Sequence, residues 1–243
     1  MEYILVLYEE KEYAKQLGAK WDGSSKKWYI PKHLNEYNKN QLRNQYSLNS
    51  ITFLKGEDRN AGGDELFVDL IPKSCWFTNV RSCIDKRDWY RLRYYIFECV
   101  NYTCECCGVT PGINPEYVYV GSDKIKISND SLEAHERWTY DENTLTQKLV
   151  RIIALCYDCH RATHIGMANI RGEYKHAFQH LKTIRNETDE QTRDHIDTAY
   201  KIWESRNIHN WNLDMSLITD NGIKIIDIPK INSNIKPGNF KLF

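Results

Sequence analysis

The chain has 243 residues, 41% of them apolar, and carries 33 basic and 33 acidic side chains, so its formal net charge is zero. A chain of this length can bury one moderate core and a small accessory unit. Without net charge, no global field draws it to nucleic acid or to a membrane surface, and any phosphate binding must come from local basic patches. This composition argues against a protein that coats DNA, but it allows an enzyme that contacts only a few phosphates.

The first residues, Met1–Tyr8, show no export signal. They lack a basic start, a long apolar run and a small-residue cleavage site, and no segment of the sequence has the length needed to span a bilayer. We therefore expect a cytoplasmic protein with no membrane partner. In a reducing compartment, the eight cysteines are expected to be metal ligands or buried apolar residues rather than disulfides.

Residues 1–32 predict a small N-terminal α/β module. Tyr3–Leu7 is strand-like, and Glu9–Leu17 has helical spacing that ends at Gly18. Lys27–Ile30 then indicates a returning strand, which Pro31 stops.

The motif from Ala14 to Asp22, AKQLGAKWD, followed by the KWYIP motif of residues 27–31, resembles a short domain of unknown function. That domain is found beside primase-like and other nucleic-acid-processing domains, and the resemblance covers this module alone. The lysines that alternate with Trp21 and Trp28 could hold phosphates while the rings stack on bases. Equally, the two tryptophans could form a small core surrounded by solvated lysines.

A polar linker is expected over residues 33–65, which are rich in Asn, Gln, Ser and Lys. Within it, Leu34–Tyr46 predicts a weak helix, and the turn at Ala61-Gly62-Gly63 closes the linker. The main domain is expected over residues 66–217. A C-terminal tail follows over residues 218–243, with Gly222–Ile226 as a possible edge strand.

Three helices are predicted in the main domain. The first spans Asp85–Cys99, where apolar residues recur at helical spacing. Its basic side chains could contact phosphate or form a solvated helix face; with a nearby arginine they are Arg81, Lys86, Arg87, Arg91 and Arg93. The second helix spans Glu173–Arg185. The third follows a capping box at Thr188-x-x-Gln191, and together the last two would close the core as a helical hairpin.

Two C-x-x-C pairs predict a structural zinc site. Each pair forms a tight knuckle that presents two sulfurs to one ion, and two pairs complete a tetrahedral thiolate site. The four expected ligands are Cys104, Cys107, Cys156 and Cys159. Cys106 lies beside Cys107 and could compete, but Cys104 has the required spacing. The remaining cysteines are expected to be free thiols.

Three histidines predict a second, open metal position. His160 and His164 are spaced i and i+4 on an expected helix, so they point from one face. His135 ends a strand-like segment and could approach them from a neighbouring element. The first ion would then stabilise the fold while the second performs chemistry. Alternatively, a second zinc would have all four of its coordination positions filled, and the histidines would be purely structural.

The residues around both sites resemble the HNH endonucleases, whose core is a ββα-metal fold. The resemblance rests on Tyr102-x-Cys-x-x-Cys-Gly108, on Leu132-Glu-Ala-His135 and on Leu155-Cys-x-x-Cys-His-x-x-x-His164. It is closest to a bacterial subgroup of HNH-type proteins and spans roughly residues 70–217.

The resemblance implies an α+β protein with a treble-clef-like, zinc-stabilised core and C-terminal helices. It also implies a divalent ion such as Mg²⁺ on His135, His160 and His164 that polarises the scissile phosphate. The products would be a 5′-phosphate and a 3′-hydroxyl.

The chain departs from the HNH motif at the general base. Where many members have a ligand followed by a basic histidine, this sequence has His135-Glu136. Either Glu136 is the base, or His135 is the base and the ion is held by His160, His164 and a carboxylate such as Glu133 or Asp141. An ordinary carboxylate, with a pKa of about 4.3, is a weak proton acceptor at neutral pH.

The second departure concerns the asparagine expected about five residues before Cys156, where the sequence has Arg151. An arginine could clamp a phosphate, but it cannot orient a histidine as an amide does.

The sequence therefore predicts a metal-dependent endonuclease that hydrolyses DNA, in a phage or defence setting. The alternative is a catalytically inactive zinc module that binds nucleic acid or a protein partner. A DNA-binding module would show salt-dependent binding without cleavage. The preferred substrate and the oligomeric state are left open by the sequence.

Overall fold

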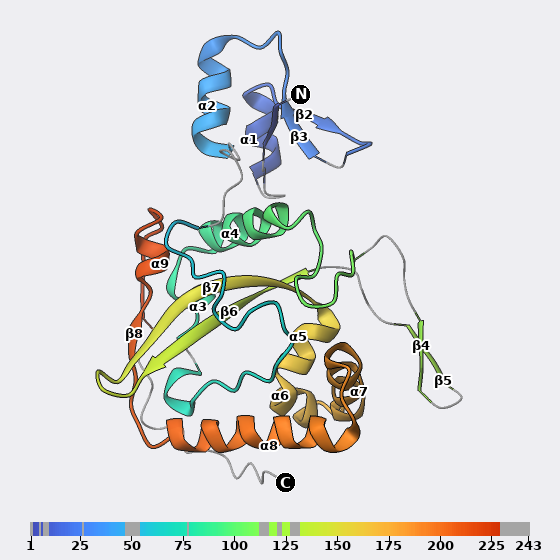
Figure 1. Cartoon of the computed structure of the whole chain (residues 1–243). Coiled ribbons are helices and arrows are strands. Elements are labelled where there is room, and N and C mark those ends of the chain that lie inside the picture. The colour runs from blue at the N-terminus through green and yellow to red at the C-terminus, as the bar shows by residue number, and fades with distance from the viewer. Residues whose placement is uncertain are drawn as a thin grey trace.

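The computed structural model describes residues 2–4, 6, 10–25, 27–46, 54–76, 78–111 and 132–228, and the backbone of 117–120 and 123–126. It is a mixed α+β chain with two separate apolar cores, one for an N-terminal module and one for a larger main domain. Figure 1 shows the module above helix α4 (Lys86–Cys99), with a long β-hairpin below α4 and helix α8 (Asp189–Arg206) furthest from the module.

The module contains a three-stranded antiparallel sheet and two helices. Strand β3 lies between β1 and β2, and Gly18, with a φ of +94°, ends α1 in the left-handed region that glycine adopts readily. In chain order the elements are β1 (Glu2–Ile4), α1 (Lys11–Gln16), β2 (Lys20–Asp22), β3 (Lys27–Ile30) and α2 (Glu36–Tyr46). Strand β2 was not predicted from the sequence.

The predicted boundary at residue 32 is corrected by the second helix. Leu42 and Tyr46 of α2 are buried together with Ile4, Ala14 and Ile30, so α2 belongs to the module and not to a linker. Leu54, within the stretch predicted as linker, is buried in the core of the main domain. The two cores are therefore joined across residues 47–53, which lie outside the described part of the chain.

The two tryptophans of the module do not share one core. Trp28 packs against the module core, whereas Trp21, directly opposite on β2, is 51% exposed. Their rings meet edge to face with centroids 5.6 Å apart. Lys27 of the module forms an ion pair of 2.8 Å with Glu98 of α4, in the main domain.

The main domain is built around the hairpin of β6 (Leu132–Asp141) and β7 (Thr146–Cys156). The two strands pair over their whole length, with His135 opposite Ile153 and an irregularity between Arg137 and Trp138. The end of β7 is buried on both faces, from Arg151 to Cys156. Helix α5 (Tyr157–Thr163) starts at the next residue, so strand, strand and helix follow one another without a loop before the helix.

The remaining elements surround this hairpin. Strand β8 (Asn212–Asp214) pairs in parallel with β7, while β4 and β5 form a separate hairpin. The shorter elements are a 3₁₀-helix (Lys73–Cys75), α3 (Val80–Cys83), β4 (Tyr117–Val120), β5 (Asp123–Lys126), α6 (Ile165–Ile170), α7 (Tyr174–Arg185) and α9 (Ser216–Thr219).

The three helices predicted in the main domain are confirmed. Asp85 caps α4 by accepting from the Arg87 N–H, and α7 begins one residue after Glu173. The capping box predicted at Thr188 and Gln191 is formed at the start of α8. The edge strand predicted over 222–226 is reduced to a single bridge between Ile84 and Ile225. Within the described residues, no helix is long and apolar enough to cross a membrane.

Deleting residues 1–46 should leave the melting transition of the main domain cooperative and nearly unchanged. This deletion breaks peripheral ion pairs such as Lys27–Glu98, and such pairs contribute about 0–1 kcal/mol each. Deleting only residues 1–32 should instead expose the apolar face of α2 and increase binding of a hydrophobic dye. Calorimetry and dye fluorescence on both truncations check this. An insoluble 47–243 fragment would show that the boundary is wrong.

Candidate functional site

Four cysteine sulfurs converge where the hairpin meets α5. Cys104 and Cys107 come from the turn after α4, Cys156 ends β7, and Cys159 lies in the first turn of α5. Their Sγ atoms all lie within 4.8 Å of one another. Cys107 and Cys156 are 3.6 Å apart, far longer than a disulfide bond. This group has the donors and spacing that could hold a metal ion such as zinc.

The first knuckle is positioned by the backbone of β7. The N–H of Glu105 donates to the Ala154 carbonyl, and the Glu105 carboxylate accepts from the Ala154 N–H. The N–H of Gly108 donates to the Cys104 carbonyl and closes the turn, and Gly108 has a φ of +73°. Glycine is the residue that reaches this conformation without strain. The backbone therefore holds Cys104 and Cys107 against the end of the strand that carries Cys156.

The electrostatics of the four thiols favour a bound cation. Contacts from the thiols of Cys107, Cys156 and Cys159 lower the pKa of Cys104, whereas contacts with Cys104 and Cys107 raise the pKa values of Cys156 and Cys159. Several thiolates cannot be ionised side by side in a buried cluster unless a positive ion lies between them. The sulfurs thus fit a metal that deprotonates them.

Helix α7 supplies a second layer of contacts that sequence reasoning missed. His180 Nε2 lies 3.2 Å from Cys159 Sγ, and His176 Nε2 lies 2.9 Å from Asp158 Oδ1. The two histidines are spaced i and i+4, so one face of α7 contacts two consecutive residues of the second knuckle. In the sequence, the one signal for these contacts was the i and i+4 spacing of His176 and His180.

Three histidines form the second group. His135 on β6, His160 on α5 and His164 at the C-terminal end of α5 each offer a ring nitrogen within 4.8 Å of the others. Their ring centroids are 5.4, 4.9 and 4.7 Å apart. His135 is 4% exposed, while His160 and His164 are half-buried. The structure thus brings together the three histidines that the sequence proposed as ligands.

The histidine group suits a divalent cation. Burial lowers the pKa of both His135 and His164 well below the usual range. Both rings are therefore neutral near physiological pH, which is the form that binds metal. Moreover, His135 Nε2 is buried without a hydrogen-bond partner in the described part of the chain, and a buried polar atom of this kind calls for a partner.

A carboxylate orients one of the three rings. Glu133 Oε2 lies 2.7 Å from His160 Nδ1, which leaves Nε2 as the ring nitrogen available for a ligand. The hydrogen bond with His160 lowers the pKa of Glu133. Glu133 is one of the two carboxylates that the sequence suggested as ion ligands. In the structure it forms a hydrogen bond with His160, itself a proposed ligand.

Asp69 is a site residue that the sequence did not suggest. It lies in an irregular segment 66 residues before His135, and its Oδ2 is 3.7 Å from His135 Nε2. Its carboxylate is 7% exposed, and burial raises its pKa. No motif or periodicity marks it, because the segment has no regular secondary structure.

The structure does not bring Glu136 to the histidines, contrary to the first of the two base hypotheses. Consecutive strand residues point to opposite faces, so Glu136 faces away from the site of His135. Its Oε1 accepts from the Val80 N–H at 2.7 Å, at the start of α3, and burial raises the pKa of Glu136 to about 7. Asp141 is also remote, since its carboxylate binds Asn143 and Thr144 in the hairpin turn.

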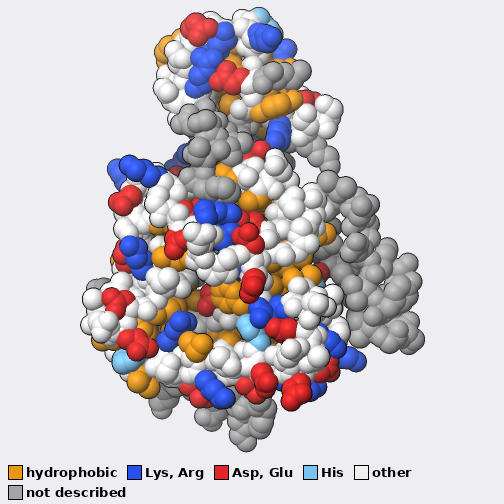
Figure 2. Space-filling model, in the orientation of Figure 1, with side chains coloured by type: hydrophobic (Ala, Val, Ile, Leu, Met, Phe, Trp, Pro, Cys, Tyr) orange, Lys and Arg blue, Asp and Glu red, His pale blue; other side chains and the backbone are white. Residues whose placement is uncertain are grey.

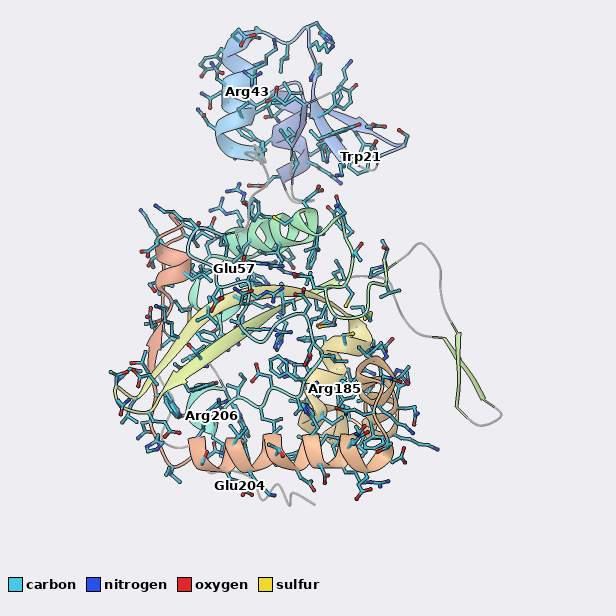
Figure 3. All side chains as sticks on the ribbon, in the orientation of Figure 1. Trp21, Arg43, Glu57, Arg185, Glu204 and Arg206 are labelled. Carbon is cyan, nitrogen blue, oxygen red and sulfur yellow. The ribbon has the colours of Figure 1, made fainter. Side chains whose placement is uncertain are left out.

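Arg151 is placed in a buried polar network instead of a catalytic cleft. Its side chain is fully buried and donates to the carbonyls of Arg59 and Gly63 at 3.0 and 2.8 Å. The same guanidinium binds Asp64 at 2.8 Å and Glu105 at 2.7 Å. These contacts occupy the groups that a phosphate would need. Figure 3 shows Glu57, another member of this region, between α4 and the hairpin.

Charged side chains of both signs are interspersed across the face of the molecule shown in Figure 2. Two members of the predicted basic cluster are paired with acidic side chains: Arg87 lies 3.4 Å from Asp85 and Arg91 lies 3.3 Å from Glu10. Arg93 is the member that reaches the histidine site, since it donates to the Leu132 carbonyl and helps to lower the pKa of Glu133.

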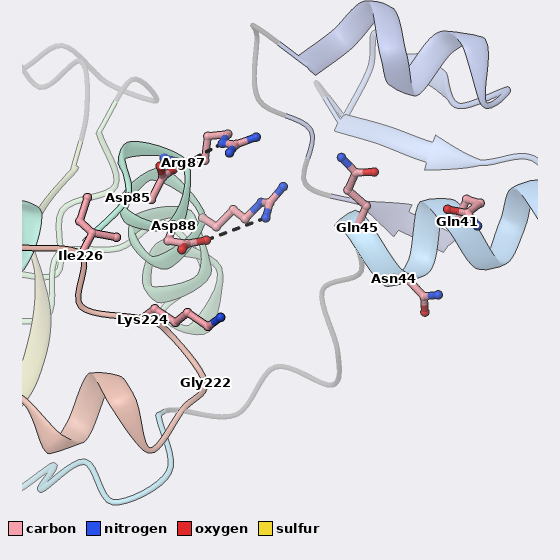
Figure 4. A pocket seen from close by; sticks show the side chains of 10 residues that line it. Gln41, Asn44, Gln45, Asp85, Arg87, Asp88, Gly222, Lys224 and Ile226 are labelled. Atoms are coloured by element: carbon pink, nitrogen blue, oxygen red, sulfur yellow. Dashed lines mark hydrogen bonds and ion pairs between the residues drawn. The ribbon is translucent and has the colours of Figure 1, made fainter.

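A polar cavity of about 620 Å³ lies away from both ligand groups. Figure 4 shows amide side chains of α2, such as Gln45, across from Asp85 and Asp88 of α4. Asp88 is 4.0 Å from Arg91, so acidic and basic groups offset one another here. Among the described residues, the lining of the cavity includes neither a nucleophile nor a group of metal ligands.

Comparison with known proteins adds information on the module alone. Residues 1–41 match a family model described as a domain of unknown function, DUF5710. The match ends within α2, in agreement with the burial of that helix in the module core. No curated protein and no solved structure matches the chain.

Metal analysis should find one tightly bound zinc per chain, and Cys156→Ser should abolish it and lower the melting temperature. The reason is that the buried thiols require the ion. His180→Ala should keep the stoichiometry but weaken zinc binding about 10–100-fold, the usual effect of losing a hydrogen-bonding partner of a ligand. Chelator competition measures this, with His209→Ala as the control. Full zinc retention in Cys156→Ser would refute the assignment.

Arg151→Met should destabilise the zinc-loaded protein by about 2–3 kcal/mol, because the Arg59 carbonyl loses its donor and Glu105 loses one of the two arginines that pair with it. The exposed Arg87→Met, which breaks only the pair with Asp85, should change stability by about 1 kcal/mol or less. Urea unfolding of both variants measures the difference. If Arg151→Met kept wild-type stability, the buried network would not have the structural role inferred above.

Proposed function

We propose that this chain is a metal-dependent endonuclease of the HNH type that hydrolyses phosphodiester bonds in DNA. The observation that carries the proposal is the convergence of His135, His160 and His164 around one point, with neutral rings and partial access to solvent. Three histidines with an open side are the donor set of a catalytic rather than a structural metal ion.

The order of elements supports the same proposal. Two paired strands lead directly into a helix, and the ligands come from the first strand and from the helix. This is the arrangement that the resemblance to a ββα-metal core implies. The neighbouring cysteine group, proposed to hold Zn²⁺, would fix the start of the helix relative to the hairpin.

In the proposed mechanism the three histidines hold a divalent ion such as Mg²⁺ or Mn²⁺. When bound there, such an ion supplies positive charge that polarises the scissile phosphate and stabilises the leaving oxygen. Glu133 keeps the His160 ring in the orientation that presents Nε2. Arg93 of α4, which donates to the Leu132 carbonyl at the start of β6, would contact a neighbouring phosphate.

The faces of β6 argue against Glu136 as the water-activating base. Glu136 points to the opposite face and holds the start of α3, so we do not assign it this role. His135 lies with the other two histidines and is assigned as a ligand. The alternative, in which His135 is the base, differs in one measurable respect, because the ion would then bind without it.

Plasmid nicking with added magnesium or manganese tests the proposal. His135→Ala and His160→Ala should each reduce nicking by more than about 100-fold, since loss of a ligand exceeds the about 10–100-fold cost of losing an outer hydrogen-bonding partner. Glu136→Gln should nick at close to the wild-type rate, because an amide oxygen can still accept from Val80. Glu142→Gln, at the exposed hairpin turn, is the control.

Manganese titration of the same zinc-loaded variants separates ligand from base. If His135→Ala abolishes nicking but binds manganese normally, His135 is the base. If the wild-type protein nicks no DNA with magnesium, manganese, nickel or zinc, and the histidine variants lose stability, the nuclease proposal fails. Salt-dependent DNA binding without cleavage would then favour the inactive zinc module.

A further inference from the structure

The segment from Leu66 to Ile71 has no regular secondary structure, yet its backbone is anchored from several sides. Arg185 of α7 donates to the Leu66 carbonyl at 2.8 Å, and the Val68 N–H donates to His195 of α8 at 3.0 Å. Trp203 of α8 donates to the Ile71 carbonyl at 2.9 Å. Figure 3 shows Arg185 beside this region. Helix side chains thus replace the hydrogen bonds of a sheet.

The central residue of this anchored segment is Asp69. Its own N–H donates at 3.0 Å to the carbonyl of Thr163, the residue before His164. The anchoring therefore fixes Asp69 directly against the end of α5 and beside β6. A carboxylate buried to this degree is costly unless it has a partner, so its place next to the histidines requires an explanation.

The group that faces Asp69 is the unpartnered nitrogen of His135. Asp69 Oδ2 lies 3.7 Å from His135 Nε2, and that nitrogen is buried with no hydrogen-bond partner among the described residues. A buried N–H that lacks an acceptor costs about 1–3 kcal/mol. The spacing is too long for a hydrogen bond, so the pairing requires the two atoms to approach by about 0.5–1 Å.

We propose that Asp69 is the positioning residue of His135. Its carboxylate accepts a hydrogen bond from the N–H of Nε2, and Nδ1 is then the ring nitrogen left to bind an ion. Histidines that bind metals commonly donate their second ring N–H to a carboxylate, which fixes the tautomer and the orientation of the ring. Glu133 acts in this way on His160, so two of the three rings would each be held by a carboxylate from outside the ligand group.

The effect of Asp69 on catalysis rests on the proposed function. Its effect on the His135 tautomer does not, because the tautomer can be measured in the full chain without added divalent cation. Nitrogen-15 NMR of the zinc-loaded protein should show the His135 proton on Nε2. In Asp69→Ala that preference should be lost. A wild-type His135 that carries its proton on Nδ1 overturns the proposal, and this result does not depend on how the variant folds.

Manganese binding provides the second readout. Asp69→Ala should weaken binding of Mn²⁺ to the zinc-loaded chain about 10–100-fold, and Asp69→Asn should recover part of the loss because its amide oxygen can still accept. Asp194→Asn is the control, since it removes an equal charge from an exposed side chain of α8. Zinc content and melting temperature confirm that each variant is folded. Unchanged affinity in Asp69→Ala overturns the proposal.

The two proposals fail in different ways. If wild-type protein nicks DNA but Asp69→Ala matches it in tautomer, manganese affinity and nicking rate, only the positioning role is refuted. If the tautomer and the manganese affinity depend on Asp69 while the wild-type protein nicks no DNA, only the nuclease assignment is refuted.

Discussion

The structure depends on the burial of four thiols at a single junction. Cys156 ends β7 and Cys159 lies in the first turn of α5, while Cys104 and Cys107 bring in the end of α4. Close thiols cannot be ionised together without a cation, so an ion held by this group would be thermodynamically linked to the fold. Because α5 begins at this junction, the direction of the helix relative to the hairpin is set there. The geometry of His160 and His164 against β6 follows from the same constraint.

Two buried arginines extend this constraint to the irregular part of the chain. Arg151 and Arg137, from neighbouring strands, both donate to the Gly63 carbonyl, and Arg137 also donates to the Glu65 carbonyl. These bonds satisfy backbone carbonyls that lie outside any sheet or helix. They hold the stretch that leads into Leu66 and Asp69. Arg151, proposed from the sequence as a catalytic residue, thus contributes to the site through the backbone it supports.

Features that depend on local spacing could be predicted from the sequence. The capping box at Thr188, the helix after Asp85 and the paired cysteines are defined by residues within a few positions of one another. Features that depend on which face a residue occupies could not. Glu136 is adjacent to His135 in sequence but lies on the opposite face of β6, and α2 reads as a polar linker because it buries mainly Leu42 and Tyr46. Asp69 lies in a segment without periodicity, so only the tertiary structure reveals it.

The distribution of charge distinguishes the two parts of the proposed activity, which are binding to DNA and the chemical step. With basic and acidic groups interspersed on the visible face and a net charge of zero, long-range attraction to DNA contributes little, and association would be slow compared with strongly basic enzymes. The chemistry needs only a few aligned groups, which the histidines supply. Affinity must then come from local contacts. On the module, the exposed ring of Trp21, which meets the ring of Trp28 edge to face, offers an aromatic surface of the kind on which single-stranded bases stack. Such a division would let the module set where the chain binds while the hairpin and α5 set what it does there.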